Sequence, residues 1–187
     1  MSAVKSPTSL KRQLIWVSYV VGFLTVIEAV NMLSGRYFNQ FSIYPRELSY
    51  LAYIFTAPFL HANFAHFVSN LVTLAIFSLL LLQFGGKRFI TVSFGLIVIT
   101  GLLVWMFART SFHLGASGII YGYFGYLVLA GFLSKRFFQI IISVVVAFFY
   151  GGMIWGVLPS QPYISWESHL FGFIAGLCLA WYLRNHS

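Results

Sequence analysis

The sequence predicts an all-α membrane protein built as a bundle of six transmembrane helices. Hydrophobic residues make up 60% of the 187 residues, charged residues make up 7%, and the mean hydropathy is +0.88. A soluble domain carries roughly a quarter charged residues, so the polar surface of a water-soluble globule is missing. Alternating strand patterns of about ten residues are absent, which leaves helices as the expected spanning form.

Six apolar runs are long enough to cross a membrane. The first follows Lys11 and Arg12 and lacks a small-residue cleavage site, so we expect a retained anchor helix rather than a signal peptide. We expect residues 1–13 to form a cytoplasmic tail and residues 14–187 to form one membrane domain. In chain order the runs cover residues 14–33, 58–84, 89–108, 116–134, 137–158 and 166–183.

The net charge of +8 follows this topology. Eight basic residues fall on one side of a six-helix arrangement and only three on the other. This positive-inside bias predicts that both termini lie in the cytoplasm. We expect a multi-pass integral protein of a bacterial inner or plasma membrane. The lipid bilayer is therefore the expected surrounding, and no nucleic acid partner is expected. The two groups are Lys5, Lys11, Arg12, Lys87, Arg88, Lys135, Arg136 and Arg184, against Arg36, Arg46 and Arg109.

Polar residues within the apolar runs mark candidate functional positions, because they are costly in lipid. Counted from the basic cytoplasmic anchors, Asn70, Ser117 and His169 all lie roughly 22–27 Å up their helices. Three helices thus bring an asparagine, a serine and a histidine to one level of a hydrocarbon core about 30 Å thick. His66 shares a helix face with Asn70, whereas His61, about 140° around from His66, is not expected to face it.

Small residues recur at every fourth position beside the serine and the histidine. This spacing lets membrane helices approach closely. The approach would bring Ser117 Oγ within hydrogen-bond reach of the His169 imidazole, and Tyr121, one turn beneath Ser117, could stack on that ring. The small residues are Gly118 and Gly122 in the fourth run and Ser168, Gly172, Gly176 and Ala180 in the sixth.

The chemistry that this arrangement permits is nucleophilic catalysis by a Ser-His dyad. Serine is a weak nucleophile until a base takes its proton, and His169 is the base at this depth. The chain contains no aspartate. Glu167 lies about 200° around the helix from His169 and is expected to point away, which excludes a Ser-His-Asp triad.

Acyl transfer also needs hydrogen-bond donors for the oxyanion. His66, Asn70 and the backbone N–H of Ser117 are the candidates. Gly115 and Gly118 would let the chain turn sharply and let a substrate carbonyl come close.

Three further residues are expected to support this arrangement. His113 is expected to hold the turn before Ser117. His61 and Asn63 are expected to lie at the membrane surface and to cap or brace the second helix.

Three motifs together resemble the rhomboid intramembrane serine proteases: "HANFAHFVSN", "GASG" with a tyrosine four residues after the serine, and "SHLFGFIAG". The resemblance spans about residues 45–183. It implies a rhomboid-like fold, and a lateral gate through which a transmembrane protein substrate reaches a water-filled cavity. It implies as site residues the nucleophile Ser117, the base His169, the oxyanion donors His66 and Asn70, and Tyr121 as the ring under His169.

The sequence departs from the rhomboid pattern in two places. The first outer loop has "YPREL" where many members have a tryptophan–arginine pair, and "QFGGKRF" lacks the acidic residue that often follows the glycines. Both differences concern loop packing and gating rather than the dyad.

The main alternative is a catalytically silent rhomboid-like protein that binds or escorts membrane proteins. That role usually goes with loss of the serine or the histidine, and both are present. A metal enzyme is disfavoured because no His-Glu-x-x-His pair occurs, so neither a metal nor another cofactor is expected. A transporter would show inverted repeats or paired broken helices, which we do not find. The substrate and the oligomeric state stay open.

Overall fold

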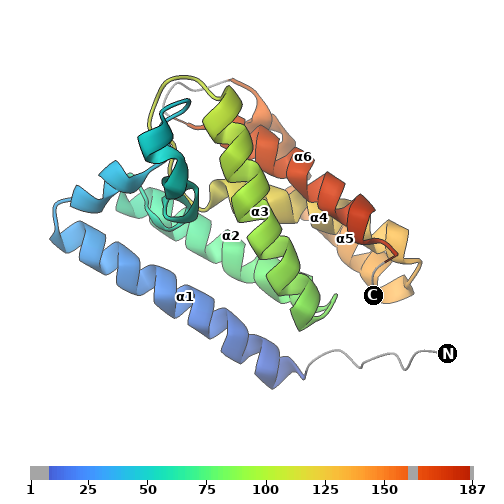
Figure 1. Ribbon diagram of the computed structural model, residues 1–187. Coiled ribbons are helices and arrows are strands. Elements are labelled where there is room, and N and C mark those ends of the chain that lie inside the picture. The colour runs from blue at the N-terminus through green and yellow to red at the C-terminus, as the bar shows by residue number, and fades with distance from the viewer. Residues whose placement is uncertain (1–8, 160–163, 186–187) are drawn as a thin grey trace.

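The computed structural model describes residues 9–159 and 164–185, and most of them are helical (Figure 1). Six α-helices lie within these residues, which confirms the predicted all-α fold. The predicted tail, 1–13, lies mostly outside the described residues, and its last four residues belong to the first helix. The helices are α1 (Leu10–Leu33), α2 (Phe64–Leu82), α3 (Gly86–Phe107), α4 (Ser117–Ser134), α5 (Phe137–Tyr150) and α6 (Trp166–Leu183).

Short 3₁₀ helices complete the described part of the chain. Three of them lie between α1 and α2: η1 (Tyr37–Phe41), η2 (Leu48–Phe55) and η3 (Ala57–Phe59). The fourth, η4 (Gly151–Val157), continues α5. The predicted second and fifth runs thus include 3₁₀ segments. In the fifth, α5 ends where the glycine pair Gly151–Gly152 begins, because glycine weakens an α-helix.

Five helical segments of the described residues are long and apolar enough to cross a membrane. They are α1 to α4 and the segment Phe137–Val157, which joins α5 to η4. The helix α6 has 18 residues, as α4 has, but it begins with the polar sequence "WESH". Within the described residues, α6 is therefore not among these five segments.

The helix α4 lies at the centre of the bundle. Of its apolar window 67% is buried, against 22% for α1 and 17% for the α5–η4 segment. It packs against α2, α3, α5 and α6, whereas α1 lies along the edge of the bundle beside α2 (Figure 1). Residues at the start of α4 are thus positioned by several helices at once.

The backbones of α4 and α6 are in direct contact. A Cβ atom added to Gly172 would overlap the carbonyl oxygen of Gly118, and one added to Gly176 would overlap that of Gly122. Only glycine fits at these positions, so the close approach predicted from the small residues is confirmed. This contact fixes the relative height of the two helices.

The turn before α4 is anchored to the segment between α1 and α2. Ile43 and His113 exchange two backbone hydrogen bonds, and the Gly115 N–H donates to the Ala57 carbonyl at 2.9 Å. The buried His113 ring also bonds the Ser165 hydroxyl at 2.5 Å and the Arg109 carbonyl at 2.9 Å. The predicted role of His113 in holding this turn is confirmed.

Candidate active site

Ser117 is the first residue of α4 and is half-buried. The chain enters the helix through Gly115, whose φ is +115°, a backbone conformation that favours glycine. Gly118 serves a different purpose, because a Cβ atom there would lie 3.2 Å from Thr100 Cγ2 and 3.5 Å from the Ser168 carbonyl oxygen. Gly115 therefore makes the turn, and Gly118 permits close packing against α3 and α6.

His169 lies in the first turn of α6 and is 8% exposed. Its ring stacks on the Tyr121 ring with centroids 4.0 Å apart and planes 6° apart, as expected from the spacing. Its Nδ1 lies 2.9 Å from the Gly156 carbonyl oxygen. A carbonyl oxygen only accepts, so Nδ1 carries the proton and Nε2 of the neutral ring keeps its lone pair. His169 is thus held in the tautomer that a general base requires.

Gly156 is a site residue that the sequence did not reveal. It lies in η4, and a Cβ atom on it would overlap the Tyr121 hydroxyl. The glycine therefore lets η4 approach Tyr121 and His169 closely enough for its carbonyl to orient the imidazole. No sequence signal marks a backbone acceptor, and only the glycine itself hints at a close contact.

Ser117 and His169 meet at the α4–α6 contact. Gly118 follows Ser117 and packs on Ser168, which precedes His169, while Tyr121 lies under the imidazole one turn below Ser117. The hydrogen bond expected between Ser117 Oγ and the imidazole is not formed among the described residues. Catalytic hydrogen bonds are often long without substrate and shorten in the reacting complex.

His66 and Asn70 project from α2 toward the turn that carries Ser117. A Cβ atom on Gly115 would lie 2.7 Å from His66 Cε1, 2.9 Å from its Nε2 and 3.4 Å from Asn70 Nδ2. Asn70 is 7% exposed, and its Nδ2 is buried without a hydrogen-bond acceptor in the described part of the chain. A buried unpaired donor is costly. The Asn70 amide lies beside the backbone of Gly115.

His61 differs from its prediction. It was not expected to face His66, but its ring is 1% exposed and packs edge-on against the His66 ring, with centroids 5.3 Å apart. The expected angle of about 140° between the two residues holds only within one α-helix, and α2 begins at Phe64, after His61. Burial, followed by the neighbouring His66 and Arg36, lowers the pKa of His61 from 6.5 to about 3, so its ring is neutral. Asn63 is confirmed as the cap, since its side chain accepts from the His66 N–H at 2.8 Å.

Glu167 points away from His169, as predicted. It is 3% exposed, and its Oε1 accepts from the Arg109 backbone N–H at 3.3 Å and lies 3.5 Å from Arg109 Nε. His169 is therefore oriented by a carbonyl and an aromatic ring instead of a carboxylate.

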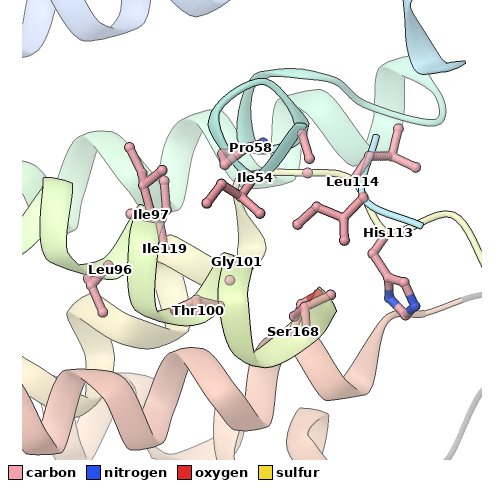
Figure 2. Close-up of a pocket in the computed structure, with 15 residues that line it drawn as sticks. Ile54, Pro58, Leu96, Ile97, Thr100, Gly101, His113, Leu114, Ile119 and Ser168 are labelled. Atoms are coloured by element: carbon pink, nitrogen blue, oxygen red, sulfur yellow. The ribbon is translucent and has the colours of Figure 1, made fainter. Parts of the chain in front are cut away.

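A small cavity borders the turn before Ser117. Its volume is about 30 Å³, on a scale where one water needs roughly 10–15 Å³, so it is too small for a peptide. Figure 2 shows Ile54 and Leu114 on one side of it and Thr100 and Ser168 on the other.

Comparison with known proteins identifies the family of this chain. The Rhomboid domain model matches residues 48–186. An uncharacterized protein of Mycobacterium tuberculosis (strain ATCC 25618 / H37Rv) is 31% identical over 172 residues, which cover 87% of this chain and 72% of that protein. An uncharacterized protein of Mycobacterium leprae (strain TN) is 31% identical over 194 residues, which cover 96% and 77%. The chain is an integral membrane protein that belongs to the rhomboid family.

Proposed function

We propose that this protein is an intramembrane serine endopeptidase that cleaves transmembrane proteins near the outer membrane face. Ser117 is the nucleophile and His169 the base. The observation that carries the proposal is the state of His169: Nδ1 donates to the Gly156 carbonyl, and the ring is stacked on Tyr121 at the α4–α6 contact. Nε2 is thus the nitrogen left to take a proton from the serine.

The reaction follows from these roles. As Ser117 Oγ attacks the scissile carbonyl, its proton passes to His169 Nε2 and the carbonyl oxygen becomes an oxyanion. Asn70 Nδ2, the His66 ring and the Ser117 backbone N–H are the proposed donors to that oxyanion. The imidazolium then protonates the leaving amine. A water that gives its proton to the same nitrogen hydrolyses the acyl-enzyme.

The position of Ser117 on its helix supports cleavage near the outer face. With both termini in the cytoplasm, as the basic residues indicate, the first residue of α4 lies at the outer end of that helix. A helical substrate hides its carbonyls in backbone hydrogen bonds, so substrates that unwind easily there should be favoured. Cuts are expected within about two helical turns of the outer boundary, beside small residues.

The test compares the full chain in lipid vesicles with its Ser117→Ala and His169→Ala variants. Ser18→Ala is the matched control, because the Ser18 hydroxyl only bonds its own helix at the Ile15 carbonyl. Wild type and the control should cleave a generic transmembrane substrate and react with a fluorophosphonate, and neither dyad variant should. Cleavage or labelling that survives in Ser117→Ala would refute the assignment.

The missing hydrogen bond at Ser117 is the observation that favours the alternative, a catalytically silent protein that binds or escorts membrane proteins. Wild-type protein that binds the substrate as tightly as Ser117→Ala but never cleaves it would establish that alternative. Mass spectrometry of the products locates the cut, and cuts at the cytoplasmic end would contradict the proposed topology or nucleophile.

A further inference from the structure

A buried polar cluster adjoins His66 and is not used in the proposed mechanism. It consists of Glu28 on α1, Arg36 shortly after α1, and His61 shortly before α2. Glu28 is 2% exposed and His61 is 1% exposed. Ionisable groups buried in a membrane protein are costly and rare, so this cluster calls for a physical explanation.

The cluster is held together by Arg36. Its Nη2 lies 2.8 Å from Glu28 Oε1, and its Nη1 donates to the His61 carbonyl oxygen at 2.8 Å. Within the described residues neither carboxylate oxygen of Glu28 has a hydrogen bond, so its contact with Arg36 is an ion pair. The other carboxylate oxygen of Glu28 lies 3.8 Å from His61 Nδ1. Glu28 thus holds the guanidinium that in turn holds the His61 backbone.

Two asparagines also help to hold the His61 carbonyl oxygen in place. Asn39 Nδ2 donates to the His61 carbonyl oxygen at 3.2 Å, and Asn31 Nδ2 donates to Asn39 Oδ1 at 2.8 Å. The Arg36 backbone has a φ of +68°, and its N–H donates to the Asn31 carbonyl at 2.7 Å, which fixes where the chain leaves α1. The end of α1 is therefore built to hold His61 in one place.

His61 in turn confines His66. The His66 ring lies between the edge-on His61 ring at 5.3 Å and the backbone of Gly115, where even a Cβ atom would lie 2.7 Å from His66 Cε1. A movement of His61 would therefore remove one of these two neighbours of the His66 ring. The ring is the part of His66 that would meet the oxyanion.

We propose that Glu28 is a positioning residue for His66, acting through Arg36 and the buried His61. The proposal rests on the proposed function, in which the His66 ring donates to the oxyanion. A positioning role predicts loss of turnover rather than of substrate binding, because the oxyanion develops only in the transition state.

The experiment measures kcat and KM of the full chain in lipid vesicles for Glu28→Gln. Glu47→Gln is the matched control, because Glu47 is exposed and lies in the loop between α1 and α2. Glu28→Gln should lower kcat by about five- to tenfold and leave KM within about twofold, while the control matches wild type. In a His66→Ala background the same change should lower kcat by less than about twofold, because the residue through which it acts is gone. Equal losses in both backgrounds, or no loss in either, would overturn the proposal.

The position of the His66 ring can be monitored independently of cleavage, by the NMR signals of isotope-labelled imidazole nitrogens. The His66 signal, identified by its loss in His66→Ala, should shift in Glu28→Gln and stay in place in Glu47→Gln. An unshifted signal overturns the proposal even in an active enzyme. If wild type cleaves nothing, the proposed function fails, and the signal still decides whether Glu28 positions His66.

A second variant covers the case in which Glu28→Gln does not fold. Arg36→Lys keeps the positive charge but lacks the second nitrogen that reaches the His61 carbonyl. It should shift the same His66 signal and lower kcat by about the same factor. Wild-type behaviour of Arg36→Lys in both measurements would overturn the proposal.

Discussion

The α4–α6 contact is made by backbone, whereas the α1–α2 contact is made by side chains. At the first, Gly118 and Gly122 on α4 lie directly against Gly172 and Gly176 on α6. At the second, the buried residues of α1 form one stripe with polar members at both ends: Gln13, Val17, Leu24, Glu28 and Asn31. Gln13 Oε1 accepts from Gln83 Nε2 at 2.7 Å at one end, and Glu28 pairs with Arg36 at the other.

The two contacts differ in what each could contribute to the proposed reaction. Backbone contact leaves no freedom in the spacing of two helices, which suits the pair that carries Ser117 and His169. In lipid, apolar side chains gain little by leaving the acyl chains, so the weakly buried α1 is held specifically by its polar ends. The α4–α6 contact should therefore be sensitive to added side-chain volume, and the α1–α2 contact to the loss of polar partners.

The largest effect is expected from adding volume at the α4–α6 contact. Gly172→Ala places a methyl group on the Gly118 carbonyl oxygen, which forces the helices apart and should abolish cleavage and lower thermal stability. The matched control is Gly22→Ala on α1, where nothing lies within 4 Å of the added atom. It should retain activity and be as stable as wild type or more so. A cleavage rate of Gly172→Ala within twofold of the wild-type rate would show that this contact does not set the spacing of α4 and α6.

A smaller loss is expected when Asn70 is changed, since α2 contributes a proposed oxyanion donor and neither residue of the proposed dyad. Asn70→Ala should lower kcat by about tenfold to a thousandfold with KM nearly unchanged, and His66→Ala should act in the same way. The losses are smaller if the two donors compensate for each other. Steady-state kinetics will measure both, with the exposed neighbour Ser69→Ala as the control. A defect confined to KM would argue against the oxyanion role.

Acid should lower the free energy of unfolding of the protein, through His61, by an intermediate amount. Burial lowers the pKa of His61 from 6.5 to about 3, so below pH 6.5 the unfolded chain binds a proton that the folded state does not. His61 thus contributes stability that is present above pH 6.5 and is lost as the pH falls toward about 3, by up to about 1.4 kcal/mol per pH unit. His61→Phe keeps a ring in place and should unfold with a shallower pH dependence between pH 5 and 7. Parallel unfolding curves for the two proteins would contradict the burial of a neutral His61.

The smallest effect is expected at the other end of α1. Gln13→Leu removes the hydrogen bond to Gln83, and such interhelical bonds in bilayers average about 0.6 kcal/mol. The free energy of unfolding should fall by about that amount, with cleavage unchanged. A measurable loss of cleavage would show that both ends of α1, and not only the Glu28 end, influence the site.

Several features could be predicted from the sequence because they depend on local chemistry. Long apolar runs must satisfy their backbone hydrogen bonds internally, so they form helices. Gly172 and Gly176 at four-residue spacing indicated the approach to α4, and Tyr121, four residues after Ser117, indicated the ring under His169. Asn63 was recognisable as a cap because its short side chain reaches the free N–H groups of a helix start.

The tertiary structure alone decided what the irregular segments do. The contact of His61 with His66 depends on where α2 begins and on the chain that leaves α1, neither of which a helical angle describes. The acceptor that orients His169 is the carbonyl of Gly156, and every residue carries such a group. The pairing of Glu28 with Arg36 arises because the chain turns back just after the end of α1. Periodicity reports which face of a helix is apolar, but contacts between non-helical segments have no periodic signal and are set by packing.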